Sequence, residues 1–244
     1  MEDRAQGRES VLREPAGAQA SRPRTAARVR VAVFALAALL PVVVGQLHRD
    51  LLPPDDLREA EVAREMWATG DHVVPQLAGR PFVEKPPGFQ AVVASAYTVA
   101  GGPTPTAARA VTAAFALLTL VAVFALGRNA LGVEGAALAV ALLGLSARFC
   151  RTAHTILLDN ALTAALAFSL LFFWRGLCEQ DARVKERAYS AAAFALGISF
   201  LFKGFVGPAL FGVGALAYLA ATRRFGELHV HGGACDLDYV SDVF

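Results

Sequence analysis

Charged side chains that can carry out chemistry are concentrated in residues 48–87, which hold eight acidic and five basic residues in an otherwise apolar chain. Lys85 follows Glu84 and precedes two prolines at the entrance to an apolar segment. At that depth an ammonium group either anchors the chain at the membrane surface or binds a lipid phosphate as a point charge. The carboxylates of Asp55 and Asp56 begin a helix-like stretch, where they either cap the helix or act in acid–base chemistry.

The stretch that follows these two aspartates has the pattern of an amphipathic helix over residues 57–69. One face is apolar at helical spacing and consists of Leu57, Ala60, Ala63, Met66 and Trp67. Asp55 or Asp56 is a favourable N-cap, and Gly70 is a favourable stop. We therefore expect a helix that lies on the outer surface of a membrane.

Six apolar blocks account for most of the remaining chain and predict an all-α, polytopic membrane protein. Of the 244 residues, 55% are hydrophobic and only 18% are charged, whereas soluble domains carry about 25% charged residues. The blocks cover residues 31–47, 110–127, 131–147, 160–174, 188–202 and 204–222. A spanning helix needs about 20 apolar residues, which several blocks reach only with their flanking residues.

Residues 88–101 form a further apolar segment that is too short to span. Fourteen helical residues rise about 21 Å, whereas the hydrocarbon core is about 30 Å thick. We expect this segment to dip into the interface. The expectation matters, because one additional span would invert the orientation of every later segment.

The distribution of charge predicts which side of the membrane each loop occupies. Residues 1–30 contain seven Arg and four acidic residues, so the positive-inside rule places the N-terminus in the cytoplasm. Loop 48–103 then lies outside. Because 88–101 does not span, Asp159 and Lys203 fall on the same outer side. The first apolar block is longer than a signal-peptide core and has no cleavage site after it, so it is expected to remain as an anchor.

Composition also limits the ligands that the chain is expected to bind. A net charge of +2 gives no indication of a nucleic-acid partner. The three cysteines have no metal-ligand spacing. A group of metal-ligating types near the C-terminus is irregularly spaced, which argues against a metal site: His229, His231, Cys235 and Asp236.

Two runs in the charged stretch resemble a known family. Residues 55–66, D-D-L-R-E-A-E-V-A-R-E-M, resemble the D-E-x-R-Y-A-E-I-A-R-E-M signature of bacterial aminoarabinose transferases and the related protein mannosyltransferases. Residues 70–87, G-D-H-V-V-P-Q-L-A-G-R-P-F-V-E-K-P-P, resemble that family's G-D-W-V-V-P-x-L-N-G-x-x-Y-x-E-K-P-P. Among the departures from these signatures, Asp56, Glu59 and His72 replace Glu, Tyr and Trp.

The resemblance extends over roughly residues 30–222. Residues 151–159 are similar to the family's second outer loop, which ends in an acidic residue, and Phe202-Lys203-Gly204 is similar to its later K-G element. It implies a partial transmembrane domain of the GT-C type over residues 31–222, with its outer loop at 48–103. The flanks, residues 1–30 and 223–244, are expected to be disordered, and the second is unlike the family.

The resemblance implies a glycosyltransferase at the outer face of the bacterial inner membrane. The donor would be a polyprenyl-phosphate sugar, a hexose or a pentose, and the acceptor a membrane lipid or a protein, as in lipid A modification or protein glycosylation. A carboxylate would activate the acceptor or stabilise an oxocarbenium-like sugar, and cations would offset charge on the departing phosphate. No cofactor is demanded, although carboxylates of this kind are compatible with a divalent metal.

The implied roles fall on seven residues. The catalytic carboxylates are Asp55 first, then Asp159, with Asp56 beside them. The substrate-binding residues are Arg58, Lys85 and Lys203 for the lipid phosphate, and Glu84, which would orient Lys85. We expect Asp55, Arg58, Lys85 and Asp159 to converge on one outward cavity.

Two other classes of function remain open from the sequence. A transporter usually carries charged residues within its spans, whereas here the charges cluster in one loop and at span ends. A membrane assembly protein without catalysis is the third reading. Members of the family are longer and carry further spans, so the resemblance also predicts a truncated or frameshifted gene product and leaves open whether it is active alone.

Overall fold

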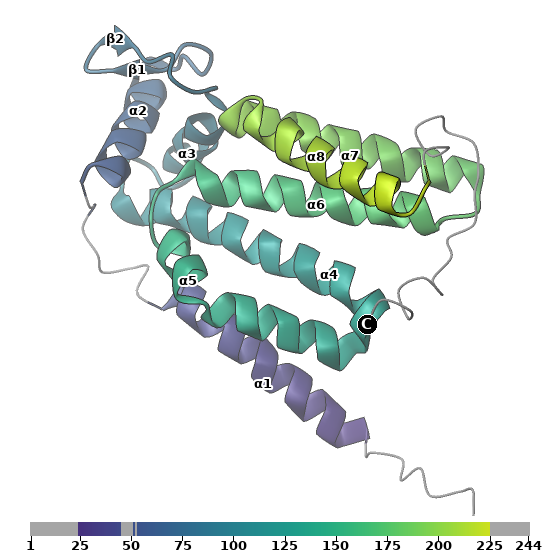
Figure 1. The fold of residues 1–244 in the computed structure, drawn as a ribbon. Coiled ribbons are helices and arrows are strands. Elements are labelled where there is room, and N and C mark those ends of the chain that lie inside the picture. The colour runs from purple at the N-terminus through teal and green to yellow at the C-terminus, as the bar shows by residue number, and fades with distance from the viewer. Residues whose placement is uncertain (1–23, 45–50, 52, 225–244) are drawn as a thin grey trace, which may run out of the picture.

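The structure is a computed structural model that describes residues 24–44, 51 and 53–224, and the expected all-α membrane architecture is confirmed (Figure 1). A small antiparallel hairpin accompanies the helices, formed by β1 (Gln76–Leu77) and β2 (Arg80–Pro81). Of the predicted disordered flanks, residues 1–23 and 225–244 lie outside the described residues, whereas residues 24–30 are helical and correct the prediction for that part. The helices are α1 (Arg24–Val43), α2 (Asp55–Thr69), α3 (Gly88–Val99), α4 (Pro105–Leu145), α5 (Ala147–Ala153), α6 (Leu158–Cys178), α7 (Ala182–Lys203) and α8 (Val206–Ala221).

Three of the described helices are long and apolar enough to cross a membrane. They run over Thr25–Val43, Pro105–Gly144 and Leu158–Cys178, and Val206–Ala221 is a shorter apolar helix. Among the described residues, each of the six predicted apolar blocks is largely helical. Helix α3 has 12 residues and a length of about 18 Å, which agrees with the expectation that 88–101 does not span.

Helix α4 reverses its direction at Gly132, so that its two segments run antiparallel (Figure 1). Gly132 has φ 70° and ψ 176°, a conformation that a residue with a side chain rarely adopts. The reversal places Gly127 beside Ala136, because a Cβ built on Gly127 would lie 3.4 Å from the Cβ of Ala136. In a straight helix these two residues would be about 13.5 Å apart. The single element therefore supplies two of the six predicted blocks.

The helices form a bundle whose core is densest near the two short helices that precede α4. Buried residues of α2, α3, α4, α6 and α7 meet in one apolar cluster. Phe115 packs against this cluster, and its ring lies 6.4 Å from that of Phe89 and 5.3 Å from that of Phe202, measured between ring centroids. Five helices that are distant in sequence are thereby fixed relative to one another.

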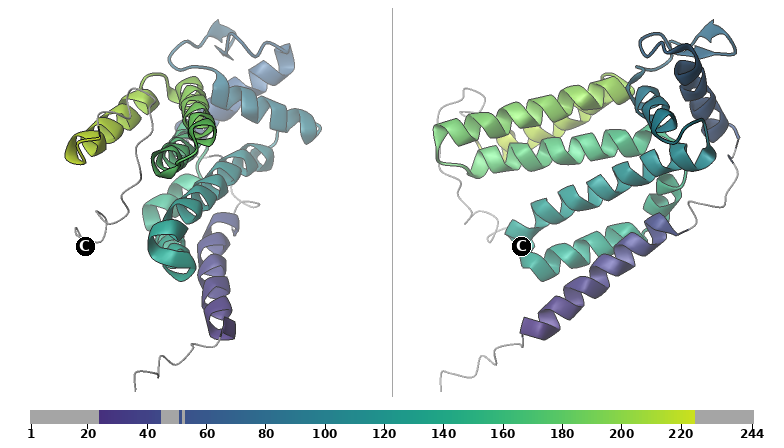
Figure 2. Two further views of the ribbon diagram at one scale, coloured as in Figure 1. Left: turned by 90° about the vertical axis from the view of Figure 1, so that its right-hand side faces the viewer. Right: turned by 180° about the vertical axis from the view of Figure 1, so that it is seen from behind.

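One end of the bundle gathers the segments that carry the candidate site. The C-terminal ends of α1 and α7 and the N-terminal ends of α4, α6 and α8 lie there, beside α2, α3 and α5 (Figures 1 and 2). Asp159 begins α6 and Lys203 ends α7. The structure thus brings them to the same end as loop 48–103, as the charge-based topology requires.

Two expectations for α2 are wrong. The residue before the helix is Pro54, and no side chain caps the helix N-terminus. The buried face also differs from the predicted one: Leu57 and Trp67 are exposed, whereas Asp56 and Glu59 are buried. Asp56 and Glu59 are buried because their side chains have partners on other segments. Gly70 does end the helix, with φ 72° and its N–H bonded to the carbonyl of Met66.

Local hydrogen bonds hold the hairpin and α3 against α2. The carboxylate of Glu65 accepts the backbone N–H groups of Ala78 and Gly79 at 2.7 and 3.2 Å. The hydroxyl of Tyr97 donates to the carbonyl of Ala60, and burial raises the pKa of Tyr97 to about 12. Loop 70–87 is therefore held in a defined position against α2.

Candidate active site

Asp55 and Asp159 line the same cavity, which we call the carboxylate cavity and which has a volume of about 350 Å³. Its walls come from the start of α2, the start of α4, helix α5 and the start of α6. The residues that line it are Pro53, Pro54, Asp55, Arg109, Arg148, Arg151, Thr152, His154, Thr155, Leu157 and Asp159. Two carboxylates from distant parts of the sequence therefore face one space, as the sequence predicted.

Arg58 connects Asp55 to a second acidic residue. Its Nη2 atom lies 3.1 Å from Oδ1 of Asp55 and 3.6 Å from Oε1 of Glu59. The pair with Asp55 spans one helical turn, and both side chains are partly exposed, so it contributes little to stability. Its main effect is to position Arg58 between Asp55, which lines the cavity, and the buried Glu59.

Glu59 is the centre of a buried polar cluster that the sequence did not assign. Its side chain is fully buried, and its carboxylate accepts from Nζ of Lys85 at 2.7 Å and from Nε2 of Gln90 at 2.6 Å. A detectable signal was the position of Glu59 on the same helical face as Ala63 and Met66. The carboxylate partner of Lys85 is thus Glu59, whereas the expected partner, Glu84, is exposed.

Asp159 forms an ion pair with Lys203, which joins the start of α6 to the end of α7. The Lys85 segment packs against this same end of α7. A Cβ built on Gly88 would lie 2.6 Å from the carbonyl oxygen of Leu201, and one built on Gly204 would lie 4.0 Å from Cγ of Pro86. Lys85 and Lys203 therefore belong to neighbouring segments. Arg58 and Lys85 do not line the carboxylate cavity and join Asp55 only through the ion-pair chain.

Asp56 is turned into the protein and not into the carboxylate cavity. Its side chain is 2% exposed, and its Oδ1 accepts the backbone N–H of Ile156 at 2.7 Å. Ile156 belongs to the short connection between α5 and α6. The contact connects the start of α2 to the segment that precedes Asp159. Asp56 therefore positions this segment and does not face the cavity.

Basic residues that the sequence did not assign complete the cavity wall. Arg109 is 2% exposed, and its Nε and Nη2 atoms have no hydrogen-bond partner among the described residues. A buried donor without a partner costs about 1–3 kcal/mol, more when charged. The available signal was an arginine directly before an apolar block, where charge is expensive. Arg148 and Arg151, from α5, are exposed.

His154 fixes the cavity wall to helix α1. Its Nδ1 lies 2.7 Å from the carbonyl oxygen of Cys150, and its Nε2 lies 2.9 Å from that of Val44. The two contacts hold the imidazole ring between helix α5 and the residue that follows α1.

The charges of the carboxylate cavity favour an anionic group. Three guanidinium groups line it with two carboxylates, and each carboxylate also pairs with a cation outside the lining, Arg58 or Lys203. The arrangement offers carboxylates for acid–base work next to cations that can stabilise a phosphate.

The family model for dolichyl-phosphate-mannose-protein mannosyltransferases matches residues 84–235, which is more than half of the 244 residues. The chain belongs to this family. The matched region contains Lys85 and Lys203, and it contains every Arg and Asp that lines the carboxylate cavity except Asp55.

Relatives of the chain within this family carry the name undecaprenyl phosphate-alpha-4-amino-4-deoxy-L-arabinose arabinosyl transferase. The protein of Edwardsiella ictaluri is 32% identical over 203 residues, which cover 82% of this chain and 36% of the relative. Transferase 2 of Sodalis glossinidius is 29% identical over 211 residues, with the same two coverages.

Solved structures agree with these sequence matches. The apo crystal structure of ArnT from Cupriavidus metallidurans superposes with a TM-score of 0.75 at 30% identity and covers 84% of this chain. The same protein bound to undecaprenyl phosphate gives a TM-score of 0.71 at 27% identity and covers 85%. This chain spans between 36% and 38% of the length of these three proteins. The apolar helices and the bacterial relatives make it a multi-pass protein of the bacterial inner membrane.

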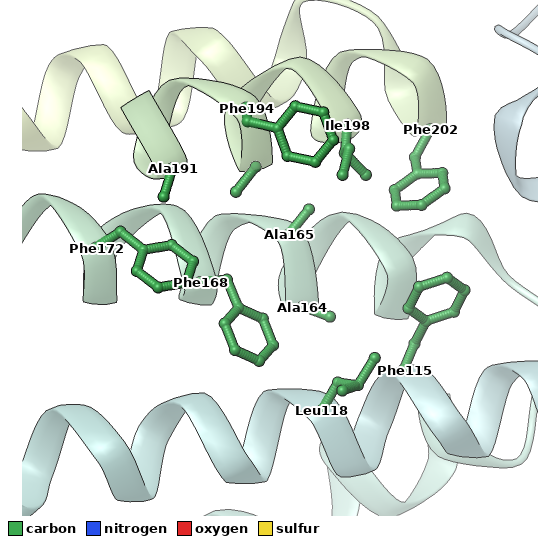
Figure 3. A pocket seen from close by; sticks show the side chains of 11 residues that line it. Phe115, Leu118, Ala164, Ala165, Phe168, Phe172, Ala191, Phe194, Ile198 and Phe202 are labelled. Atoms are coloured by element: carbon green, nitrogen blue, oxygen red, sulfur yellow. The ribbon is translucent and has the colours of Figure 1, made fainter. Parts of the chain in front are cut away.

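An apolar cavity of about 420 Å³ adjoins the charged end of this mannosyltransferase-family bundle (Figure 3). Side chains of α4, α6 and α7 face one another across it, and Phe115 and Phe202 lie at one end. Phe202 directly precedes Lys203, so the apolar space begins next to the Asp159–Lys203 pair. Within residues 24–44, 51 and 53–224, no group of three or more His, Cys, Asp or Glu side chains is placed to hold a metal ion. The irregular His229–Asp236 group lies outside those residues.

Proposed function

We propose that this chain takes part in moving a sugar from a polyprenyl-phosphate donor to a lipid or protein acceptor at the outer face of the inner membrane. The observation that carries the proposal is the carboxylate cavity, where Asp55 and Asp159 meet beside basic residues at one end of an apolar bundle. Membership of the mannosyltransferase family and the likeness to ArnT support it.

The basic residues supply the binding site for the donor phosphate in this proposal. Lys85 and Arg58 approach from the loop, Lys203 from α7 and Arg109 from α4. They would offset the negative charge that grows on the lipid phosphate as its bond to the sugar breaks. The apolar cavity next to Lys203 provides room for the first part of the polyprenyl chain.

Asp55 acts on the other side of the reacting carbon. The bond from the anomeric carbon to the phosphate oxygen breaks, and a bond from that carbon to an acceptor oxygen forms. Asp55 accepts the proton of an acceptor hydroxyl or, for an acceptor that is already ionised, stabilises positive charge on the sugar. Asp159 holds Lys203 close to the leaving phosphate. A divalent metal at these carboxylates is compatible with the scheme but is not required by it.

The placement of charge separates this function from transport and from assembly without catalysis. A transport path would place ionisable groups in the middle of the spans. Here the ion pairs of Asp55 and Asp159 lie at one end of the bundle. An assembly protein would have no reason to bind a polyprenyl phosphate at that end.

Binding of the donor's lipid phosphate tests the proposal directly. We expect the purified 244-residue chain in detergent to bind undecaprenyl phosphate, as measured by native mass spectrometry. The variant Lys85→Gln should bind at least about tenfold more weakly, because a charged hydrogen bond is worth about 1.5–3 kcal/mol. Arg183→Gln, an exposed cation at the far end of α7, serves as the control and should bind like the wild type. No binding by the wild type would contradict the donor assignment.

The orientation in the membrane is a separate prediction from charge asymmetry. In a chain whose own cysteines are replaced, Val73→Cys should react with a membrane-impermeant maleimide added to intact cells. Val73 is 78% exposed, so access within the loop is not limiting. Arg183→Cys at the opposite end should be protected until the cells are opened. The reverse pattern would place the site on the cytoplasmic face.

A further inference from the structure

We propose that Glu59 is a positioning residue of the donor site, which holds the ammonium of Lys85 in place and moderates the positive charge that the site offers to a lipid phosphate. The inference rests on the proposed function, because it concerns the same phosphate. The family signature has a neutral tyrosine at this position. The glutamate of this chain adds a negative charge there.

Each oxygen of the Glu59 carboxylate has its own donor. Oε1 accepts from Nζ of Lys85 at 2.7 Å, and Oε2 accepts from Nε2 of Gln90 at 2.6 Å. Two donors from different segments fix both the position and the rotation of the carboxylate. Lys85 lies just before α3 and Gln90 within it, so Glu59 on α2 determines where the Lys85 ammonium sits.

The ammonium of Lys85 remains able to bind a ligand while it contacts Glu59. A lysine ammonium has three donors, and Glu59 uses one of them. The Lys85 side chain keeps 24% of its surface exposed, whereas that of Glu59 has none. One side of the ammonium is therefore anchored in the protein and the other side is open.

The charges of this cluster balance. Asp55 and Glu59 oppose Arg58 and Lys85, and all four are joined by contacts of 3.6 Å or less. Without the charge of Glu59 the same cluster would carry one net positive charge. A phosphate would then be held more tightly, and the lipid phosphate left after transfer would leave more slowly. Glu59 thus sets a compromise between capture of the donor and release of the product.

Glutamine at this position separates charge from shape. The Oε1 atom of Gln90 is buried, and it has no partner in the part of the chain that the structure describes. If the Gln90 amide flips, its Oε1 atom can accept from the new NH2 group of Glu59→Gln. The side-chain oxygen that remains in Glu59→Gln still accepts from Lys85. The variant therefore keeps the hydrogen-bond pattern and loses only the charge.

The first test is binding of undecaprenyl phosphate to the purified full chain in detergent. We expect Glu59→Gln to bind about tenfold more tightly than the wild type, because one charge within a few ångströms is removed. Glu59→Ala loses the anchor as well and should bind more weakly than Glu59→Gln. Glu61→Gln, on the exposed side of the same helix and paired with Arg64 at 2.7 Å, is the matched control and should bind like the wild type. Unchanged or weaker binding by Glu59→Gln, or equal binding by the two Glu59 variants, would overturn the inference.

The second test needs no ligand and separates failure of this inference from failure of the proposed function. The sequence contains three lysines, Lys85, Lys185 and Lys203. We expect an amine-reactive ester to label Lys85 several-fold faster in Glu59→Ala than in the wild type, because the ammonium is no longer held against the carboxylate. Labelling of Lys203, paired with Asp159, should not change. An unchanged rate at Lys85 in a folded variant removes the positioning role even if the wild type binds undecaprenyl phosphate. A faster rate in a chain that does not bind the lipid would contradict the donor assignment instead.

Discussion

Asp55→Asn should lower sugar transfer from a polyprenyl-phosphate donor by at least about 100-fold, the size expected when a general base or a charge-stabilising carboxylate is lost. Asparagine has nearly the same shape, and its oxygen can still accept from Arg58, so the fold should be retained. Transfer is measured in membranes that contain the chain, with a radiolabelled donor. The binding of undecaprenyl phosphate is measured on the same samples.

A second aspartate of the same loop provides the control for this result. The carboxylate of Asp71 accepts the N–H groups of Val73 and Val74, which lowers its pKa and holds a turn. Asparagine forms the same turn, so Asp71→Asn should transfer sugar like the wild type. Transfer that is equal in Asp55→Asn and in the wild type would exclude Asp55 as the catalytic carboxylate.

Arg109→Leu should separate ligand binding from stability. The guanidinium lines the carboxylate cavity, but its buried Nε and Nη2 atoms have no partner among residues 24–44, 51 and 53–224. Replacing such a group by an apolar side chain is often neutral or stabilising. We expect an unfolding temperature equal to or above that of the wild type, together with at least about tenfold weaker binding of undecaprenyl phosphate, since a charged hydrogen bond to phosphate is lost.

The contrary result has a clear meaning. If Arg109→Leu unfolds at a lower temperature and binds the lipid like the wild type, the arginine serves the fold and not the ligand. Arg148→Leu, an exposed position on the same cavity wall, is the companion variant. It should have little effect on stability and a smaller effect on binding, because its charge is screened by solvent.

Much of the fold follows from the sequence because a segment that enters a membrane has to be apolar along its length, which is visible in the sequence itself. The apolar blocks and the short segment 88–101 can be identified without tertiary information. Gly132, where α4 reverses, is the second residue of the block 131–147. The face of α2 did not follow. Asp56 and Glu59 are buried there because their partners, the N–H of Ile156 and the ammonium of Lys85, come from elsewhere in the chain.

The candidate site divides in the same way. Counting spans was enough to place Asp55, Lys85, Asp159 and Lys203 at one end of the bundle. Arg109 was missed because it precedes an apolar block and resembles an anchor at the membrane surface. The partner of Lys85 was assigned to its sequence neighbour Glu84, whereas the fold supplies a carboxylate one helix away. Pairings of this kind depend on the packing of α2 against α3, which local patterns do not record.

The hydrogen bond from Ile156 to Asp56 has a mechanical consequence. Asp56 adjoins Asp55, and Ile156 lies three residues before Asp159, so this buried contact works as a strut between the two carboxylates. Opening the gap between them would strand a buried acceptor and a buried donor together, which makes such a fluctuation rare. The two acids should therefore move as one rigid body when the cavity opens to a substrate.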